Sequence, residues 1–160
     1  MARPVTIDRI DHMVLTVADI DKTCDFYARV LGMEKVVFAG GRVALSFGRQ
    51  KINLHPAKNP YDPRAKVALP GTGDLCLIAK TPIAKVIQHL KAEGVPILQG
   101  PVPKTGATGG PITSVYFRDP DDNLIEVTDL LHMYPVLRWL GPLGGWIFRR
   151  GMYKKYYGRS

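Results

Sequence analysis

The chain has 160 residues, 46% of them hydrophobic, and a formal net charge of +8; this length and composition fit one globular domain with a sound core plus a tail. It has no run of about 18 apolar residues, so no membrane-spanning helix is predicted, and the opening MARPVTIDRI lacks the apolar stretch of a signal peptide. Cys24 and Cys76 are too few for a disulfide framework, so reduced, buried thiols in a cytoplasmic protein are expected.

The positive charge is concentrated at the C-terminal end. Residues 131–160 hold six basic and no acidic side chains, which leaves 16 basic against 14 acidic residues in 1–130. Seven of the 14 aromatic residues also lie in 131–160. Such a segment fits contact with a membrane surface, or a tail packed on its own domain or on a dimer partner. No basic and aromatic stripe extends into residues 1–130, so nucleic acid is not an expected partner.

The first half of the chain alternates between strand and helix signals. Residues 10–17 read as a strand, with Met13, Leu15 and Val17 on one face. Asp19 or Asp21 is expected to cap the helix that follows, and Gly32 to end it. Three short strands are then predicted at 34–38, 42–47 and 51–55, and a loop rich in Pro, Gly and charged residues fills 56–73.

The second half repeats this order. A strand is predicted at 74–80, a helix opened by Thr81 and Pro82 and ended by Gly94, a short strand at 95–98, a Gly-rich loop, and strands at 112–117 and 123–129. A shift of 62 residues carries Met13, Leu15 and Val17 onto Leu75, Leu77 and Ala79. A shift of 73 carries the last strand of the first half onto the last strand of the second. The sequence therefore predicts an α+β fold of two tandem βαβββ modules, about 7–56 and 73–130, that form a curved mixed sheet.

The duplication also gathers polar residues on the sheet face that the helices leave open. The same shifts pair His12 with Asp74 and Asn53 with Glu126, while His55 lies one pleat beyond Asn53. Glu126 stands in the middle of an apolar strand, where a carboxylate is costly unless it is paired or binds a metal. Cys76 alternates onto the same face and is expected to serve as small packing. Nitrogen and oxygen donors from distant segments suit a divalent metal, although an exposed edge-strand Glu126 is an open alternative.

The segments IDHMVLTV, DFYARVLGM and VYFRDPDDNLIEV resemble the vicinal oxygen chelate superfamily, which includes glyoxalases, extradiol dioxygenases and bleomycin-resistance proteins. FGRQKINLHP and the segment from Gly71 to Ala107 look closest to the glyoxalase domain-containing protein 5 group. The resemblance covers roughly residues 7–130. It implies a U-shaped metal site in which His12 and Glu126 are ligands, and relatives of this kind are often homodimers.

The sequence departs from the glyoxalase I pattern at two positions, since Asn53 stands for a Glu and Asp74 for a His. Asp74 and His55 are therefore the further candidate ligands, and Asn53 becomes a candidate substrate-binding residue together with Lys104 and Thr105 of the Gly-rich loop. The metal would be Zn, Ni, Mn or Fe(II), which the residues do not distinguish.

Three functions follow from this donor set. Glu126 could act as ligand and base in a lyase or isomerase that holds two oxygens of a small substrate. The same donors suit a ring-cleaving Fe(II) dioxygenase. The departures at Asn53 and Asp74 also fit a small-molecule binding protein without catalysis.

Overall fold

The computed structural model describes residues 4–129 and contains the two predicted βαβββ modules. The first consists of β1 (His12–Val17), α1 (Ile20–Leu31), β2 (Glu34–Phe38), β3 (Arg42–Phe47) and β4 (Gln50–Pro56). The second consists of β5 (Asp74–Ala79), α2 (Ile83–Ala92), β6 (Ile97–Thr105), β7 (Pro111–Arg118) and β8 (Leu124–Asp129). Residues 131–160, with their expected membrane or partner contacts, lie outside the described part of the chain. Within 4–129, no helix has the length and apolar character to cross a membrane.

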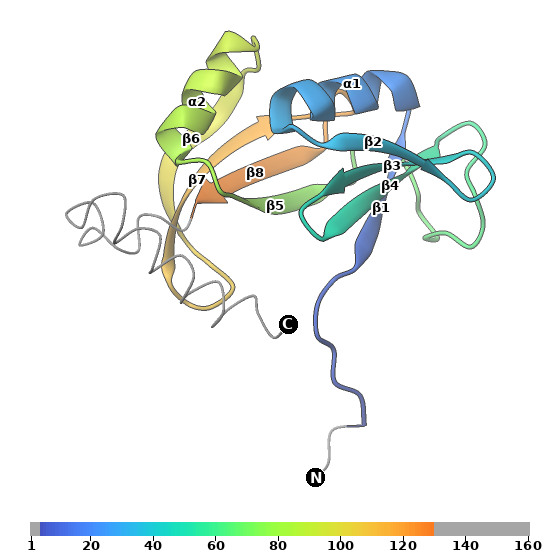
Figure 1. Ribbon diagram of the computed structural model, residues 1–160. Helices are drawn as coiled ribbons and strands as arrows, with labels where there is room; N and C mark the ends of the chain where they lie inside the picture. The colour runs from blue at the N-terminus through green and yellow to red at the C-terminus, as the bar shows by residue number, and fades with distance from the viewer. Residues whose placement is uncertain (1–3, 130–160) are drawn as a thin grey trace.

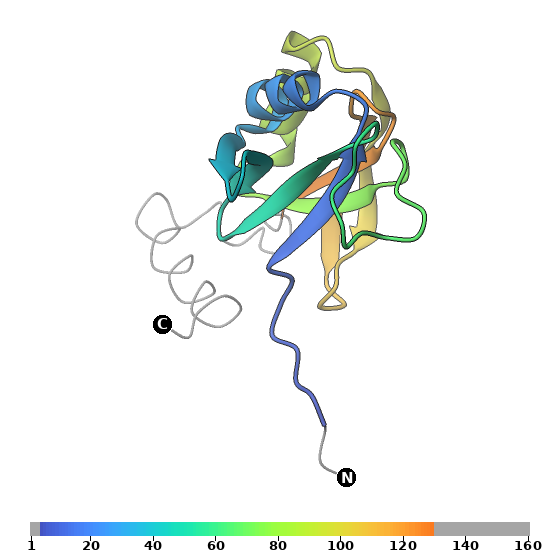
Figure 2. The same ribbon diagram turned by 90° about the vertical axis from the view of Figure 1, so that its right-hand side faces the viewer.

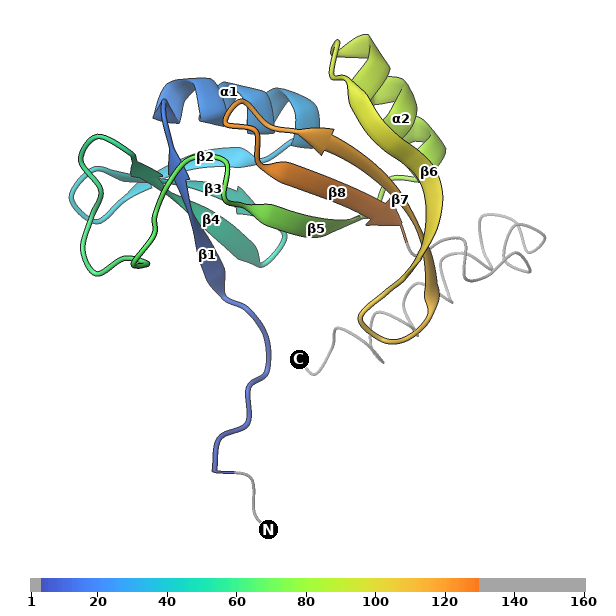
Figure 3. The ribbon, with the colours of Figure 1, turned by 180° about the vertical axis from the view of Figure 1, so that it is seen from behind.

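Each module forms its own four-stranded mixed sheet. The strand orders are β1-β4-β3-β2 and β5-β8-β7-β6, and the first pair of each order is parallel while the others are antiparallel. The expected curved surface is thus built from two sheets. Both helices lie on the same side of these sheets (Figures 1 and 3), so the opposite sheet faces are left for a site.

The helix ends follow local chemistry, with one exception. Asp19 caps α1 by accepting a hydrogen bond of 3.0 Å from the Lys22 amide, and Gly32 ends the helix in the left-handed conformation. At α2 the expected Thr81 cap is wrong. Pro82 occupies the cap position without a side-chain bond, and the buried Asp129 of β8 accepts a 2.6 Å hydrogen bond from the Ile83 amide instead. A residue 46 positions away performs the capping, which no local pattern predicts.

The core lies between the helices and the sheets. Alternate residues of β1, β4, β5 and β8 face the helices, and the buried set is Leu15, Val17, Ile52, Leu54, Leu75, Ile125 and Val127. Tyr27 and Phe117 are fully buried where the two modules meet. Because these apolar residues occupy one side of each strand, the polar residues between them must lie on the other side.

The polar turn between β7 and β8 is part of the interior. Asp119 is 6% exposed and accepts hydrogen bonds from the Tyr27 hydroxyl at 2.9 Å and from the Asn123 side-chain amide at 2.8 Å. Asn123 in turn accepts a 2.7 Å bond from the Gly73 amide. This chain of bonds joins α1, the turn and the start of β5, so it fixes the second module against the first.

The expected Gly-rich loop before β7 is wrong, because β6 extends through it to Thr105. Strand β6 is the outer strand of its sheet, and its pairing with β7 shifts register between Ile97 and Val102. An edge strand with bulges can accommodate Pro101 and Pro103, which a central strand could not. Lys104 and Thr105 therefore project from a strand.

Candidate functional site

The strand registers place the predicted donors in two matching pairs. On β1 and β4, His12 lies opposite Lys51 and Val14 lies opposite Asn53, so His12 and Asn53 are diagonal neighbours on one face. On β5 and β8, Asp74 lies opposite Leu124 and Cys76 opposite Glu126, so Asp74 and Glu126 are diagonal neighbours in the same way. We call His12 with Asn53 the first half-site and Asp74 with Glu126 the second half-site.

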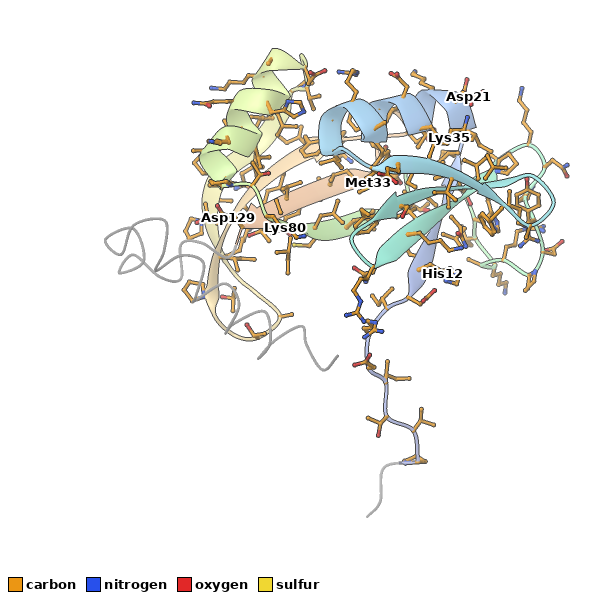
Figure 4. The ribbon with its side chains drawn as sticks, in the orientation of Figure 1. His12, Asp21, Met33, Lys35, Lys80 and Asp129 are labelled. Atoms are coloured by element: carbon orange, nitrogen blue, oxygen red, sulfur yellow. The ribbon has the colours of Figure 1, made fainter. Side chains whose placement is uncertain are left out.

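In the first half-site, His12 is exposed at the start of β1, on the side of the molecule away from the helices (Figure 4). Its Nδ1 lies 2.8 Å from Oδ1 of Asp11, and this hydrogen bond is the main reason why the pKa of Asp11 is lowered. A carboxylate that accepts from Nδ1 orients the ring and leaves Nε2 as the ligating nitrogen. Asn53 Oδ1 is buried and has no hydrogen-bond partner among the described residues, which suits an oxygen that meets a bound ligand.

His55 takes a different position. It lies opposite Thr16, four residues along β1 from His12, which corresponds to about 13 Å of strand. The structure therefore does not bring His55 beside His12. His55 is 7% exposed, and its ring meets the ring of Tyr61 edge-on, with centroids 5.1 Å apart. Burial, followed by the positive charges of Arg42 and Arg64, lowers the pKa of His55.

The second half-site contains a group of polar side chains around Glu126. Cys76 and Tyr116 lie directly opposite Glu126 on the two neighbouring strands. Desolvation, followed by the charge of the Glu126 carboxylate, raises the pKa of Cys76 to about 11. Desolvation and a hydrogen bond to Glu126 raise the pKa of Tyr116 to about 12. Both groups keep their protons at neutral pH, so they can donate hydrogen bonds to the carboxylate or to a ligand beside it.

Of the two predicted substrate-binding residues on β6, only Lys104 lies near this group. Its Nζ lies 5.5 Å from the centroid of the Tyr116 ring, which places a positive charge beside the second half-site. Thr105 is paired with Pro111 near the end of the β6–β7 hairpin and is exposed.

The four predicted metal ligands do not converge within one chain. Residues 4–129 contain no group of three or more His, Cys, Asp or Glu side chains that could hold a metal ion. The prediction of a buried Cys76 is wrong, since the residue is exposed while Cys24 is buried. The open face of β5 leaves Cys76 and Asp74 accessible.

Sequence reasoning missed Tyr116 and the residues around His55. The sequence did contain a signal for Tyr116. The turn between β7 and β8 makes residue 118 the partner of residue 124, and in an antiparallel pair residue 116 is then the partner of Glu126. No such signal existed for Tyr61 and Arg64, whose positions depend on the path of the 56–73 loop. In Figure 2 this green segment between β4 and β5 lies beside β1.

These two modules and their open faces match a known protein family. The model of the Glyoxalase/Bleomycin resistance protein/Dioxygenase superfamily matches residues 9–127. The chain belongs to this superfamily. Its vicinal oxygen chelate fold is therefore established, which confirms the resemblance seen in both halves of the sequence.

Individual members of the superfamily extend the comparison. Virulence protein STM3117 of Salmonella typhimurium is 52% identical over 122 residues, which cover 76% of this chain and 84% of that protein. Its crystal structure has a TM-score of 0.76 at 51% identity and covers 78% of this chain and 98% of that one. The glyoxalase domain-containing protein RDO1 of Mycosarcoma maydis is 49% identical over 126 residues, 79% of this chain and 70% of RDO1. A lactoylglutathione lyase from Agrobacterium tumefaciens is 26% identical with a TM-score of 0.60, and the match covers 80% of this chain and 96% of that one.

Proposed function

We propose that the protein is a divalent-metal-dependent enzyme of the glyoxalase/dioxygenase type whose site is shared by two copies of the chain. The first half-site of one copy would face the second half-site of the other. The observation that carries this proposal is that the two half-sites match, while each is incomplete in residues 4–129. A homodimer with two such sites satisfies both facts. We also assign the chain to the glyoxalase domain-containing protein 5 group within the superfamily.

The donors of the two half-sites fit a metal when they are combined. His12 Nε2, Asn53 Oδ1 and the carboxylates of Asp74 and Glu126 are one nitrogen and three oxygen donors, a set that suits Zn, Ni, Mn or Fe(II). The unpartnered Asn53 oxygen and the Asp11 bond that orients His12 both support this assignment. We leave His55 out of the ligand set because of its distance along β1 from His12.

The chain's own residues supply the acid–base chemistry. Bound at this site, the metal would provide Lewis-acid polarisation of two neighbouring substrate oxygens. Glu126 would accept a proton from the substrate at a carboxylate oxygen. Tyr116 keeps its phenol proton and can donate it to a developing oxyanion. Lys104 offers a positive charge to an anionic part of the substrate.

Metal content and turnover test this function together. Protein purified without chelator is expected to hold one metal per chain, and the Glu126→Gln variant is expected to lose most of it. Formation of lactoylglutathione tests the lyase reaction, and oxygen uptake with catechol tests the dioxygenase reaction. If Zn, Ni, Mn and Fe(II) all failed to bind to the wild-type protein, the proposal would be abandoned.

A second candidate function is small-molecule binding without catalysis. The observation in its favour is that an amide at Asn53 replaces a carboxylate, which leaves a less charged donor set. Under this function, Glu126→Gln would leave the affinity for a ligand nearly unchanged and no substrate would turn over. A Glu126-dependent reaction would eliminate this candidate.

A further inference from the structure

A cavity of about 300 Å³ lies between β1, β5 and the 56–73 loop. Its polar side chains are Thr16, His55, Arg64, Thr72 and Asp74. The rest of its wall is mainly apolar, formed by Met13, Val14, Leu15, Val67, Ala65, Ala68 and Leu75. This size is at the lower end of the range for pockets that bind small molecules. We call it the loop pocket.

Positive charge lies near His55 in the loop pocket. Arg64 lines it and forms an ion pair with Asp62 through Nη1, which engages one of the five N–H donors of a guanidinium. Arg42 lies above the Tyr61 ring at 4.7 Å, and Tyr61 contacts His55. Both arginines act electrostatically on His55, where the one opposing carboxylate is that of Asp62.

His55 adds an unused polar atom. Its Nδ1 is buried and has no hydrogen-bond partner among residues 4–129, although a buried polar atom without a partner costs about 1–3 kcal/mol. A ligand oxygen that accepts from this nitrogen would remove the cost. A carboxylate can accept from the imidazole and from the Arg64 fork at once, because it has two oxygens and about four lone-pair positions.

The pocket also borders both half-sites. Val14 lies opposite Asn53, and Asp74 opens β5 and belongs to the second half-site. The carboxylate of Asp74 is not among the charges that act on His55, and it would repel an anionic group beside it, so the carboxylate of a ligand is expected beside Arg64 and His55. The apolar part of the wall accommodates a short hydrocarbon body.

We infer that the loop pocket binds a small carboxylic acid, with its carboxylate held by Arg64 and His55 and its short apolar body against Val14, Val67 and Leu75. This inference rests on the proposed function in one respect. The carboxylic acid is the end of the substrate that the protein recognises, and the other end of the substrate carries the oxygens that reach the half-sites. Binding of the acid itself requires neither metal nor turnover. The role of His55 is then substrate recognition, in place of the metal ligation expected from the sequence.

Nuclear magnetic resonance titrations of metal-free, chelator-treated full-length protein test this inference. The probes are butyrate, its uncharged analogue butyramide, and inorganic phosphate, which has charge but no apolar body. Butyrate is expected to bind saturably with shifts at amides 64–68 and 72–75, and at least tenfold more tightly than butyramide or phosphate.

Three variants identify the groups responsible. Arg64→Gln is expected to weaken butyrate binding at least tenfold and His55→Phe at least threefold. Lys66→Gln makes the same charge change in the same loop at an exposed residue that does not line the pocket, and it is expected to alter the affinity less than twofold. Equal losses in Arg64→Gln and Lys66→Gln, equal binding of butyramide, or shifts confined to other residues would each overturn the inference.

The same titrations separate this inference from the metal-dependent function. If butyrate binds as described while the wild-type protein takes up no metal, the pocket stands and the proposed enzyme function falls. If the metal binds and a substrate turns over with no effect of Arg64→Gln on KM, the function stands and the substrate is anchored elsewhere.

Discussion

The two modules share one architecture but present different surfaces on their open faces. In the first module, the 56–73 loop covers part of the face, so Thr16 and His55 are buried although they point away from the helices. In the second module, Asp74 and Cys76 are exposed and Glu126 is half-buried between Tyr116 and Cys76. The difference indicates a division of roles after duplication. The first module contributes β1 and His55 to the pocket beneath the loop, and the second offers an open carboxylate beside two groups that keep their protons, Cys76 and Tyr116.

The largest effect is expected at the carboxylate of the second module. Replacing Glu126 with Gln should lower turnover by a factor of about 10²–10⁴, the range for loss of a general base, because an amide cannot accept the substrate's proton. Stability should change little, since Glu126 is only half-buried. Steady-state kinetics with thermal unfolding as the companion measurement checks this. Asp122→Asn, at an exposed acid of the preceding turn, is the matched control and should retain full activity.

A second prediction concerns the bonds that hold the two modules together. Asp119→Ala removes the acceptor for Tyr27 and Asn123 in a buried network, so the free energy of unfolding should fall by about 3–5 kcal/mol. Urea unfolding measures it. Asp122→Asn alters the same turn at an exposed position and keeps a residue type that tolerates the left-handed φ of 66° found there, so it should cost less than about 0.5 kcal/mol. A loss of under 1 kcal/mol for Asp119→Ala would show that the modules are fixed by apolar packing alone.

A smaller effect is expected in the first module at the bond that orients His12. Asp11→Ala leaves the imidazole in place but removes the acceptor of its Nδ1, so metal affinity should fall about 10–100-fold, as it does when such orienting partners are removed. Calorimetric metal titration measures this loss. Asp8→Ala removes a nearby exposed acid that pairs with Arg9 and should leave the affinity unchanged. If both variants lost affinity equally, only the general negative charge would matter.

The smallest effect is spectroscopic and belongs to the second module. The pKa of Tyr116 is raised to about 12 by desolvation and by Glu126, and Glu126→Gln should move it down toward the ordinary value of about 10. A raised pKa favours the protonated folded state, so this contribution to stability is fully present below pH 10 and is lost as pH rises toward 12. Ultraviolet difference titration against Tyr116→Phe isolates this group. An unchanged titration midpoint would mean that Glu126 does not act on Tyr116.

The sequence predicts most of the fold because the fold is repeated. The strand at 34–38 and the strand at 42–47 are found where alternation and paired turns place them, and the end of α1 at Gly32 follows from its left-handed conformation. The sequence does not predict the full length of β6, because Pro101 and Pro103 usually break strands and only the edge position and bulges of β6 permit them.

The site was predictable only in part. Alternation places His12, Asn53, Asp74 and Glu126 on the open faces, and the registers agree. What the sequence could not provide are contacts made by loops and distant partners, such as Tyr61 on His55 and Asp129 at the start of α2. Whether the donors of the two half-sites meet depends on how the modules are arranged in space. Strand periodicity contains no information about that arrangement.

Subunit complementation tests the central claim most directly. His12→Ala and Glu126→Gln chains, each expected to bind metal weakly as homodimers, are mixed after reversible dissociation, and metal content is measured. If the site combines the half-sites of two copies, each heterodimer contains one intact site, because the unaltered His12 of one chain faces the unaltered Glu126 of the other. We predict partial recovery of metal binding on mixing. Formation of heterodimers without any recovery would contradict a site shared between two chains.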